Sequence, residues 1–149
     1  MLECRLTLDD AEVRDAQDLR VEVFCREQGV PHGAEIDGLD RDALHVVAVD
    51  RGEIVATCRL LYEGEALRLA RMAVREGRRG EGIGSALLEE AEAEAKRRGA
   101  REVVLHAQRS AEPFYAAHGY ETEGTPFVEV GIEHLRMRKS VWDPLDGQL

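Results

Sequence analysis

A basic, glycine-rich turn at residues 78–85 carries the clearest chemical signal in this chain of 149 residues. It reads Arg-Arg-Gly-Glu-Gly-Ile-Gly-Ser, between a strand-like run that ends at Val74 and an amphipathic pattern that begins near Ile83. Alternate glycines let the backbone lie directly against a ligand. The first turn of a helix adds N–H groups without internal partners and a dipole that favours anions. The turn therefore predicts a binding site for a diphosphate.

Two common nucleotide motifs do not fit this turn. A P-loop needs Gly-Lys-Ser/Thr at the start of the helix, whereas this chain has Gly84-Ser85 without a lysine. A dinucleotide-binding fingerprint needs Gly or Ala in place of Ser85. It also needs to follow the first strand of a βαβ unit, and here the turn follows three successive strand-like runs. Both of these site classes are excluded by context.

The elements that must position the turn follow from the spacing of apolar residues. We expect helices at residues 11–28, 83–98 and 110–118, and an acidic loop-like stretch at 29–43. Its acidic part at 34–42 either attracts a cationic amine or is simply solvated. Strands are expected at residues 2–8, 44–49, 54–62, 66–74, 102–107 and 132–139, with one more beginning at Tyr120. The tail from Trp142 to Leu149 has no pattern, so we expect it to be loosely held.

Composition restricts the class of protein. The length is that of one globular domain, residues 1–149, and no apolar run approaches the ~20 residues that span a membrane. A net charge of −10 disfavours nucleic acid as the main partner. The three cysteines are widely spaced, which disfavours a disulfide framework or a zinc site and predicts buried or half-buried thiols. With no signal peptide in the pattern, we expect a cytoplasmic protein without a metal.

Longer motifs around the turn resemble those of a known superfamily. Arg79-Gly-Glu-Gly-Ile-Gly84 resembles Arg/Gln-x-x-Gly-x-Gly/Ala, the coenzyme A pyrophosphate motif of GNAT N-acetyltransferases, and Arg71-Met-Ala-Val74 before it is typical of their fourth strand. Gln108-x-x-Ala-x-x-Phe-Tyr-x-x-x-Gly-Tyr120 is similar to their Asn-x-x-Ala-x-x-Leu-Tyr-x-x-x-Gly-Phe, with glutamine in place of asparagine.

Further segments are similar to the ElaA/YjcF-like branch of that superfamily, which is small and prokaryotic. They include Val23-Phe24-x-x-Glu27-Gln28, Glu35-x-Asp37-x-x-Asp40 and Phe127-x-Glu129-x-Gly131-Ile132-x-His134. The resemblance implies an α/β GNAT fold, with a mixed, mainly antiparallel sheet of about six or seven strands flanked by helices. A homodimer is compatible with it.

The resemblance also implies the reaction. An amine would attack the thioester of acetyl-CoA directly, with free backbone N–H groups of the fourth strand polarising the carbonyl and Tyr115 protonating the leaving thiolate. The residues expected to hold the cofactor are Met72, Ala73, Val74, Arg79, Gly80, Glu81, Gly82, Ile83, Gly84, Ser85 and Gln108.

The incoming ammonium must lose a proton, against a pKa of ~10.4 for an alkyl amine. Glu27, His45 and Glu129 are the candidate bases, and no spacing selects one of them. His106, His118 and His134 lack the spacing of metal ligands. The acceptor is a small-molecule or protein amine. Two other functions stay open: a coenzyme A-binding sensor or partner module without transfer activity, and transfer of a longer acyl group.

Overall fold

The structure is a computed structural model that describes residues 1–142. Most of the tail that we expected to be loosely held lies outside the described residues. The strands are β1 (Leu2–Leu6), β2 (Leu44–Asp50), β3 (Glu53–Glu63), β4 (Ala66–Val74), β5 (Glu102–Gln108), β6 (Glu121–Glu129) and β7 (Ile132–Ser140). The α-helices are α1 (Asp10–Arg20), α2 (His32–Glu35), α3 (Ile83–Arg97) and α4 (Glu112–Ala117). The other helical segments are η1 (Val21–Glu27), η2 (Asp40–Asp42), η3 (Glu76–Arg78) and η4 (Arg109–Ala111).

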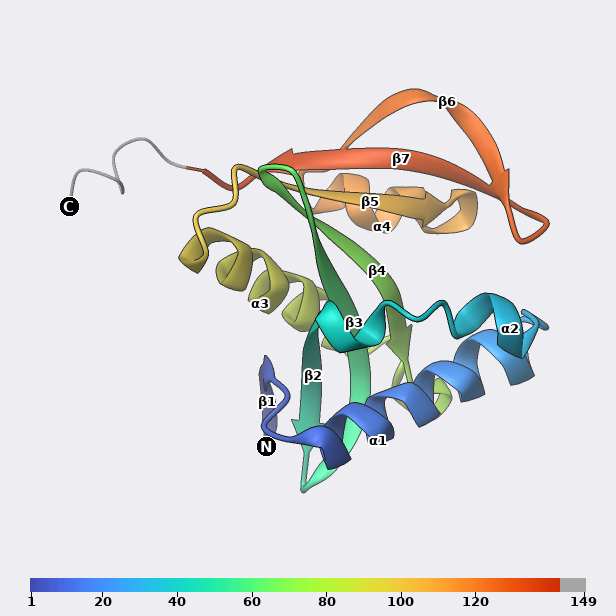
Figure 1. The fold of residues 1–149 in the computed structure, drawn as a ribbon, viewed down its shortest axis with the longest axis vertical. Helices are drawn as coiled ribbons and strands as arrows, with labels where there is room; N and C mark the ends of the chain where they lie inside the picture. Colours follow the sequence, from blue (N-terminus) through green and yellow to red (C-terminus); the bar gives the residue numbers. More distant parts are fainter. Residues whose placement is uncertain (143–149) are drawn as a thin grey trace. The chain divides into compact units, whose positions relative to one another are not determined.

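The strands form one seven-stranded sheet in the order β1-β2-β3-β4-β5-β7-β6 (Figure 1). The pairs β1–β2, β2–β3, β5–β7 and β6–β7 are antiparallel. The α/β fold with a mainly antiparallel sheet, expected from the sequence, is therefore confirmed. The chain divides into two compact units: the first comprises residues 1–61 and 69–91, and the second comprises residues 62–68 and the chain from Glu92 onward.

The core of the first unit forms where the first helix covers the strands. Asp9 caps α1 by accepting a hydrogen bond from the Glu12 N–H at 2.9 Å, which satisfies one of the free donors at the helix start. The buried residues that pack together are Ala16, Leu19, Val23, Val47, Ile54 and Ala73. The apolar stripe of the helix thus meets β2, β3 and β4, as its spacing predicts.

The first helix differs from the expected regular α-helix over 11–28. It is α-helical only to Arg20 and continues as the π-helix η1, in which the Gln28 N–H donates to the Val23 carbonyl at 3.2 Å. This wider turn lets consecutive residues, Val23 and Phe24, both contact the core. Few helices contain a π-turn, but those that do often carry it at a functional site. The segment η1 ends at Glu27.

The second unit has its own buried set. Residues of β5 and β7 contribute Val103, Val104, Leu105, Ala107, Leu135 and Met137, and the segment 115–120 contributes Tyr115 and Tyr120. The Tyr120 hydroxyl donates to Glu92 at 2.8 Å and Lys139 Nζ donates to the same carboxylate at 3.0 Å. These bonds hold the C-terminal half of α3 against Tyr120 and β7.

Among residues 1–142, no helix combines the length and the apolar character that a membrane crossing requires.

Candidate active site

The glycine-rich turn has the backbone shape that a close-fitting ligand requires. Gly80 and Gly82 have φ angles of +81° and +83°, in the left-handed region that side chains disfavour. A Cβ atom built on either residue would meet no atom within 4 Å, so the space beside the backbone is open. The turn can therefore accommodate an extended anion against its main chain.

Helix α3 begins directly after this turn. The Ala86 N–H donates to the Gly82 carbonyl at 3.1 Å, which closes the first turn of the helix. The N–H groups that precede this bond point along the axis away from the helix body, where they and the dipole of a 15-residue helix favour an anion. The predicted anion cradle is thus formed mainly by main-chain groups.

The first arginine of the turn is paired within the protein. Arg78 donates to Asp50 at 2.9 Å and to Glu81 at 3.1 Å. The pKa of Arg78 is raised chiefly by the hydrogen bond to Asp50 and then by the hydrogen bond to Glu81. Two carboxylates offset its charge, so the attraction for an anion rests chiefly on the backbone.

The second arginine connects three parts of the first unit. Arg79 Nε donates to the Val74 carbonyl at 3.0 Å, and its Nη2 lies 2.8 Å from Glu27 Oε2. The guanidinium therefore joins the end of β4, the glycine-rich turn and the end of η1. Among the predicted residues, the structure brings Glu27 together with Val74 and the cradle.

A strained residue precedes the expected thioester donors on β4. Arg71 has a φ of +57°, although it is not a glycine. Such a backbone conformation costs about 1–2 kcal/mol and inside a strand is typical of a bulge, which leaves backbone groups without ladder partners. Arg71 Nη2 is anchored by the carbonyls of Ala34 and Glu35 at 3.2 and 3.3 Å. Met72, Ala73 and Val74 follow this strained residue.

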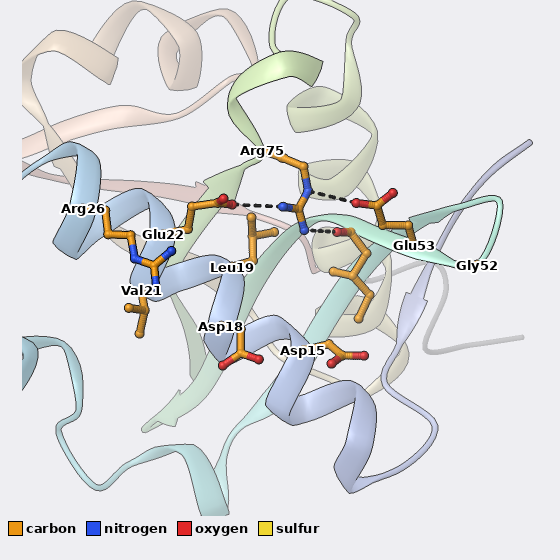
Figure 2. Close-up of a pocket in the computed structure, with 10 residues that line it drawn as sticks. Asp15, Asp18, Leu19, Val21, Glu22, Arg26, Gly52, Glu53 and Arg75 are labelled. Atoms are coloured by element: carbon orange, nitrogen blue, oxygen red, sulfur yellow. Dashed lines mark hydrogen bonds and ion pairs between the residues drawn. The ribbon is translucent and has the colours of Figure 1, made fainter.

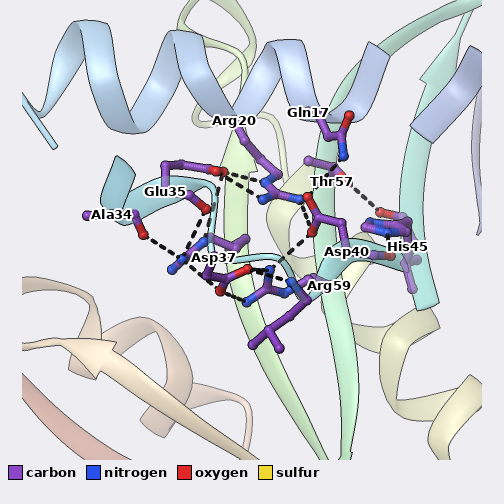
Figure 3. A network of polar contacts seen from close by, with 12 residues as sticks. Gln17, Arg20, Ala34, Glu35, Asp37, Asp40, His45, Thr57 and Arg59 are labelled. Carbon is purple, nitrogen blue, oxygen red and sulfur yellow. Dashed lines mark hydrogen bonds and ion pairs between the residues drawn. The ribbon is translucent and has the colours of Figure 1, made fainter. Parts of the chain in front are cut away.

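Most residues of the acidic loop are exposed, as one of the two expectations has it, but three of its carboxylates are paired with arginines and are not free to attract an amine. Arg20 makes two hydrogen bonds to Glu35, at 2.5 and 3.1 Å, and one to Asp40 at 2.8 Å (Figure 3). Arg59 binds Asp37 at 2.7 and 2.9 Å. Figure 3 shows these side chains converging beneath α1 from the loop and from β3. They form a neutralised network that fixes the loop.

The network shifts the pKa values of its members. The hydrogen bond from Arg59 lowers the pKa of Asp37 to about 2. Burial would raise the pKa of Asp40, but the hydrogen bond and the charge of Arg20 outweigh it, and the pKa lies below its usual range. Burial lowers the pKa of Arg71. Both acids therefore stay ionised at neutral pH.

His45, one of the three candidate bases, lies in this network. It is 4% exposed, and its Nε2 lies 3.0 Å from the Asp40 carbonyl, which can only accept (Figure 3). The Nε2 atom therefore carries the proton, and the buried Nδ1 has no hydrogen-bond partner. A nitrogen enclosed in this way is a poor point of contact for a substrate.

Tyr115 and Gln108 belong to the second unit. Tyr115 is 7% exposed, and its ring meets Phe114 and Tyr120 edge-on with centroid distances of 5.0 and 5.8 Å. Gln108 ends β5. The roles predicted for these residues as general acid and cofactor contact remain predictions.

The third candidate base, Glu129, lies beside a histidine that sequence reasoning set aside. Its Oε1 is 2.9 Å from His106 Nδ1, and its Oε2 is 3.9 Å from His134 Nε2. One feature of the sequence could have pointed to His106: it stands two residues before Gln108 on β5 and so lies on the same face of the strand. Arg59 was missed as well, although a charged residue inside the apolar run of β3 predicts a buried ion pair.

One pocket opens on the first unit, with a volume of about 630 Å³. Arg75 crosses it, donating to Glu22 at 3.0 Å and to the Ile54 carbonyl at 3.1 Å and lying 3.5 Å from Glu53 (Figure 2). Asp15 and Asp18 add carboxylates from α1. None of the predicted site residues lines this pocket.

In the part of the chain that the structure describes, no three His, Cys, Asp or Glu side chains are arranged to hold a metal ion. All three cysteines are free thiols; Cys58 is buried and the other two are half-buried, as predicted. Burial raises the pKa of the Cys58 thiol far above its usual value, which makes it unreactive.

Comparisons with known proteins find relatives over most of the chain. The family profile described as acetyltransferase (GNAT) domain matches residues 12–141. An uncharacterized N-acetyltransferase of Bacillus subtilis, YjcF, is 35% identical over 132 residues, which cover 88% of this chain and 94% of that protein.

Solved structures share the fold over nearly the whole chain. A putative N-acetyltransferase from Lactobacillus plantarum has a TM-score of 0.89 at 28% identity, covering 95% of this chain and 99% of that one. Escherichia coli ElaA has a TM-score of 0.83 at 27% identity, covering 93% and 99%. An aminoglycoside 6'-N-acetyltransferase complexed with coenzyme A, at 16% identity, shares the fold alone, with a TM-score of 0.75 and coverage of 96% and 98%.

Proposed function

The chain belongs to the GNAT acetyltransferase family, and we propose that it transfers an acetyl group from acetyl-CoA to a primary amine. The observation that carries the proposal is the open cradle at Gly80 and Gly82, before the first turn of α3. It fits a diphosphate, because the main chain is bare on one side and its N–H groups are directed outward.

Each step of the proposed reaction has a candidate group in the chain. The cradle from Arg79 to Ser85 would anchor the cofactor, with Gln108 as a further contact. Backbone N–H groups of Met72, Ala73 and Val74, after the strained Arg71, would polarise the thioester carbonyl. Tyr115 would protonate the leaving thiolate.

The proposal treats residues 1–149 as one acetyltransferase domain that acts in the cytoplasm as a monomer or homodimer. The free thiols support a reducing compartment. The acceptor is a small-molecule or protein amine, since the family alone does not select one.

A pair of matched glycine variants tests the cradle. Gly82→Ala and Gly52→Ala both place a side chain at a left-handed residue, with φ of +83° and +78°, and both have open space around the new Cβ. Each should therefore lose about 1–2 kcal/mol of stability. Only Gly82→Ala should weaken acetyl-CoA binding in calorimetry, because its methyl group would intrude on the cradle.

Release of free coenzyme A thiol in the presence of a panel of primary amines then tests transfer. Tight acetyl-CoA binding with no thiol release from any amine would support a sensor instead. No binding of acetyl-CoA by the unmodified protein would contradict the proposal altogether. Mass spectrometry of a co-purified thioester would reveal a longer acyl group.

A further inference from the structure

The strand β5 presents two polar side chains at alternate positions near its end. His106 and Gln108 are both half-buried, whereas the intervening Ala107 and the preceding Leu105 are buried. Since alternate residues of a strand share a face, His106 lies on the same side of β5 as Gln108. The two half-buried polar side chains make this the face of β5 on which we look for contacts with a polar substrate group.

Two neighbours determine where His106 carries its proton. Glu129 Oε1 lies 2.9 Å from Nδ1, and an ionised carboxylate can only accept. Arg136 Nη1 lies 3.3 Å from Nε2, and a guanidinium can only donate. Both contacts require the same neutral tautomer, with the proton on Nδ1 and a lone pair on Nε2.

The contact with Arg136 is one that a substrate ammonium could replace. Arg136 is held by Glu63 at 2.9 Å and lies 3.5 Å from Glu123, so carboxylates already satisfy most of its charge. Its contact with His106, at 3.3 Å, is longer than its hydrogen bond to Glu63. An ammonium, like a guanidinium, offers only donors, so it satisfies the same lone pair on Nε2.

The ring of His106 is also fixed in orientation. Phe127 meets it edge-on with a centroid distance of 5.0 Å, and stacks on His134 at 6.1 Å. The Nδ1 atom of His134 lies 2.7 Å from the Ile132 carbonyl, and its Nε2 is 3.9 Å from Glu129, too far for a hydrogen bond. His106 is therefore the imidazole that Glu129 orients.

We propose that His106 Nε2 accepts the proton of the acceptor ammonium, and that Glu129 is a positioning residue that holds the tautomer. This rests on the proposed transferase function and selects among the bases that the sequence left open. Glu27 is engaged by Arg79, and His45 is enclosed in the network beneath α1.

The proposed step is balanced as follows. One proton of R–NH₃⁺ passes to His106 Nε2 and then to solvent, and the freed lone pair forms the C–N bond with the thioester carbon. The C–S bond breaks, and the coenzyme A thiolate takes a proton from Tyr115. The second proton lost by the amine restores the Tyr115 hydroxyl, so the products are the acetamide, coenzyme A thiol and one proton.

The kinetic test compares His106→Gln and Glu129→Gln with His32→Gln, an exposed histidine of α2. Thiol release is measured from pH 5 to 9 with whichever panel amine the unmodified protein uses. His106→Gln should lower kcat by about 100-fold with acetyl-CoA affinity unchanged. It should also change the dependence of the rate on pH, because the base that accepts the proton is gone. His32→Gln should behave as the unmodified protein.

The structural test is nitrogen NMR of histidine-labelled protein without substrate. The unmodified protein should show the Nδ1–H tautomer at His106. Glu129→Gln should admit the Nε2–H tautomer, because the amide can donate to Nδ1, and it should lower kcat less than His106→Gln. Circular dichroism of each variant checks folding.

The outcomes separate the two proposals. An active protein whose His106→Gln variant keeps its rate and pH profile overturns the role of His106 and leaves the transferase intact. An Nε2–H tautomer in the unmodified protein overturns the role of His106 whether or not an acceptor is found. Failure to bind acetyl-CoA overturns the transferase, and the role of His106 with it.

Discussion

The buried arginine of α1 offers a stringent test of how the first unit is held together. Arg20 is 1% exposed and binds Glu35, itself 3% exposed, and Asp40. The variant Arg20→Met keeps most of the side-chain volume but leaves Glu35 with only Arg71, 3.9 Å away. A buried carboxylate that loses its partner costs about 3–5 kcal/mol.

This cost is a large fraction of the ~5–15 kcal/mol by which domains are stable. It corresponds to a fall in Tm of roughly 6–20 °C at this chain length. Urea unfolding followed by far-UV circular dichroism measures it, and an unchanged m-value would show that the same surface unfolds. Arg109→Met is the control, because that arginine is 59% exposed and its bond to Glu133 is worth at most about 1 kcal/mol.

A double variant identifies the cause. Arg20→Met with Glu35→Leu removes the unpaired charge, so it should be more stable than Arg20→Met alone. If Arg20→Met costs no more than Arg109→Met, the network does not stabilise the loop. If the double variant loses as much stability as Arg20→Met and Glu35→Leu lose separately when added together, the loss arises from packing. The electrostatic reasoning would then be wrong.

Three further predictions follow from individual groups. Tyr115→Phe should lower kcat by about 100-fold with acetyl-CoA affinity nearly unchanged; a collapse of affinity in calorimetry would assign Tyr115 to packing. The pKa of Asp37 is lowered from 3.8 to about 2, chiefly by the hydrogen bond from Arg59. The stability that the ionised Asp37 contributes is therefore complete above about pH 4 and is lost as the pH falls towards 2. This loss in the free energy of unfolding, about 2 kcal/mol, should not appear when the stability of Asp37→Asn is measured as the pH is lowered. Glu27→Gln should tighten acetyl-CoA binding a few-fold at low salt, because it removes a carboxylate that competes for Arg79; weaker binding would mean that Glu27 orients the arginine.

The sequence by itself determined the fold class and the glycine-rich turn that we propose as the cofactor cradle. Both depend on local rules: apolar periodicity sets the strands and helices, and the glycines of residues 80–84 shape a turn without help from distant residues. The family resemblance rested on the same contiguous motifs, which is why it extended over nearly the whole chain.

Contacts between distant residues were decided only by the tertiary structure. Arg20 and Glu35 are 15 residues apart, and His106 and Glu129 are 23 apart, with nothing in either spacing to pair them. The pairing of the acidic loop could not be foreseen, because its arginine partners come from α1, β3 and β4. A side chain's proton, charge and exposure depend on which groups the fold places beside it, so the sequence could propose three bases but could not choose between them.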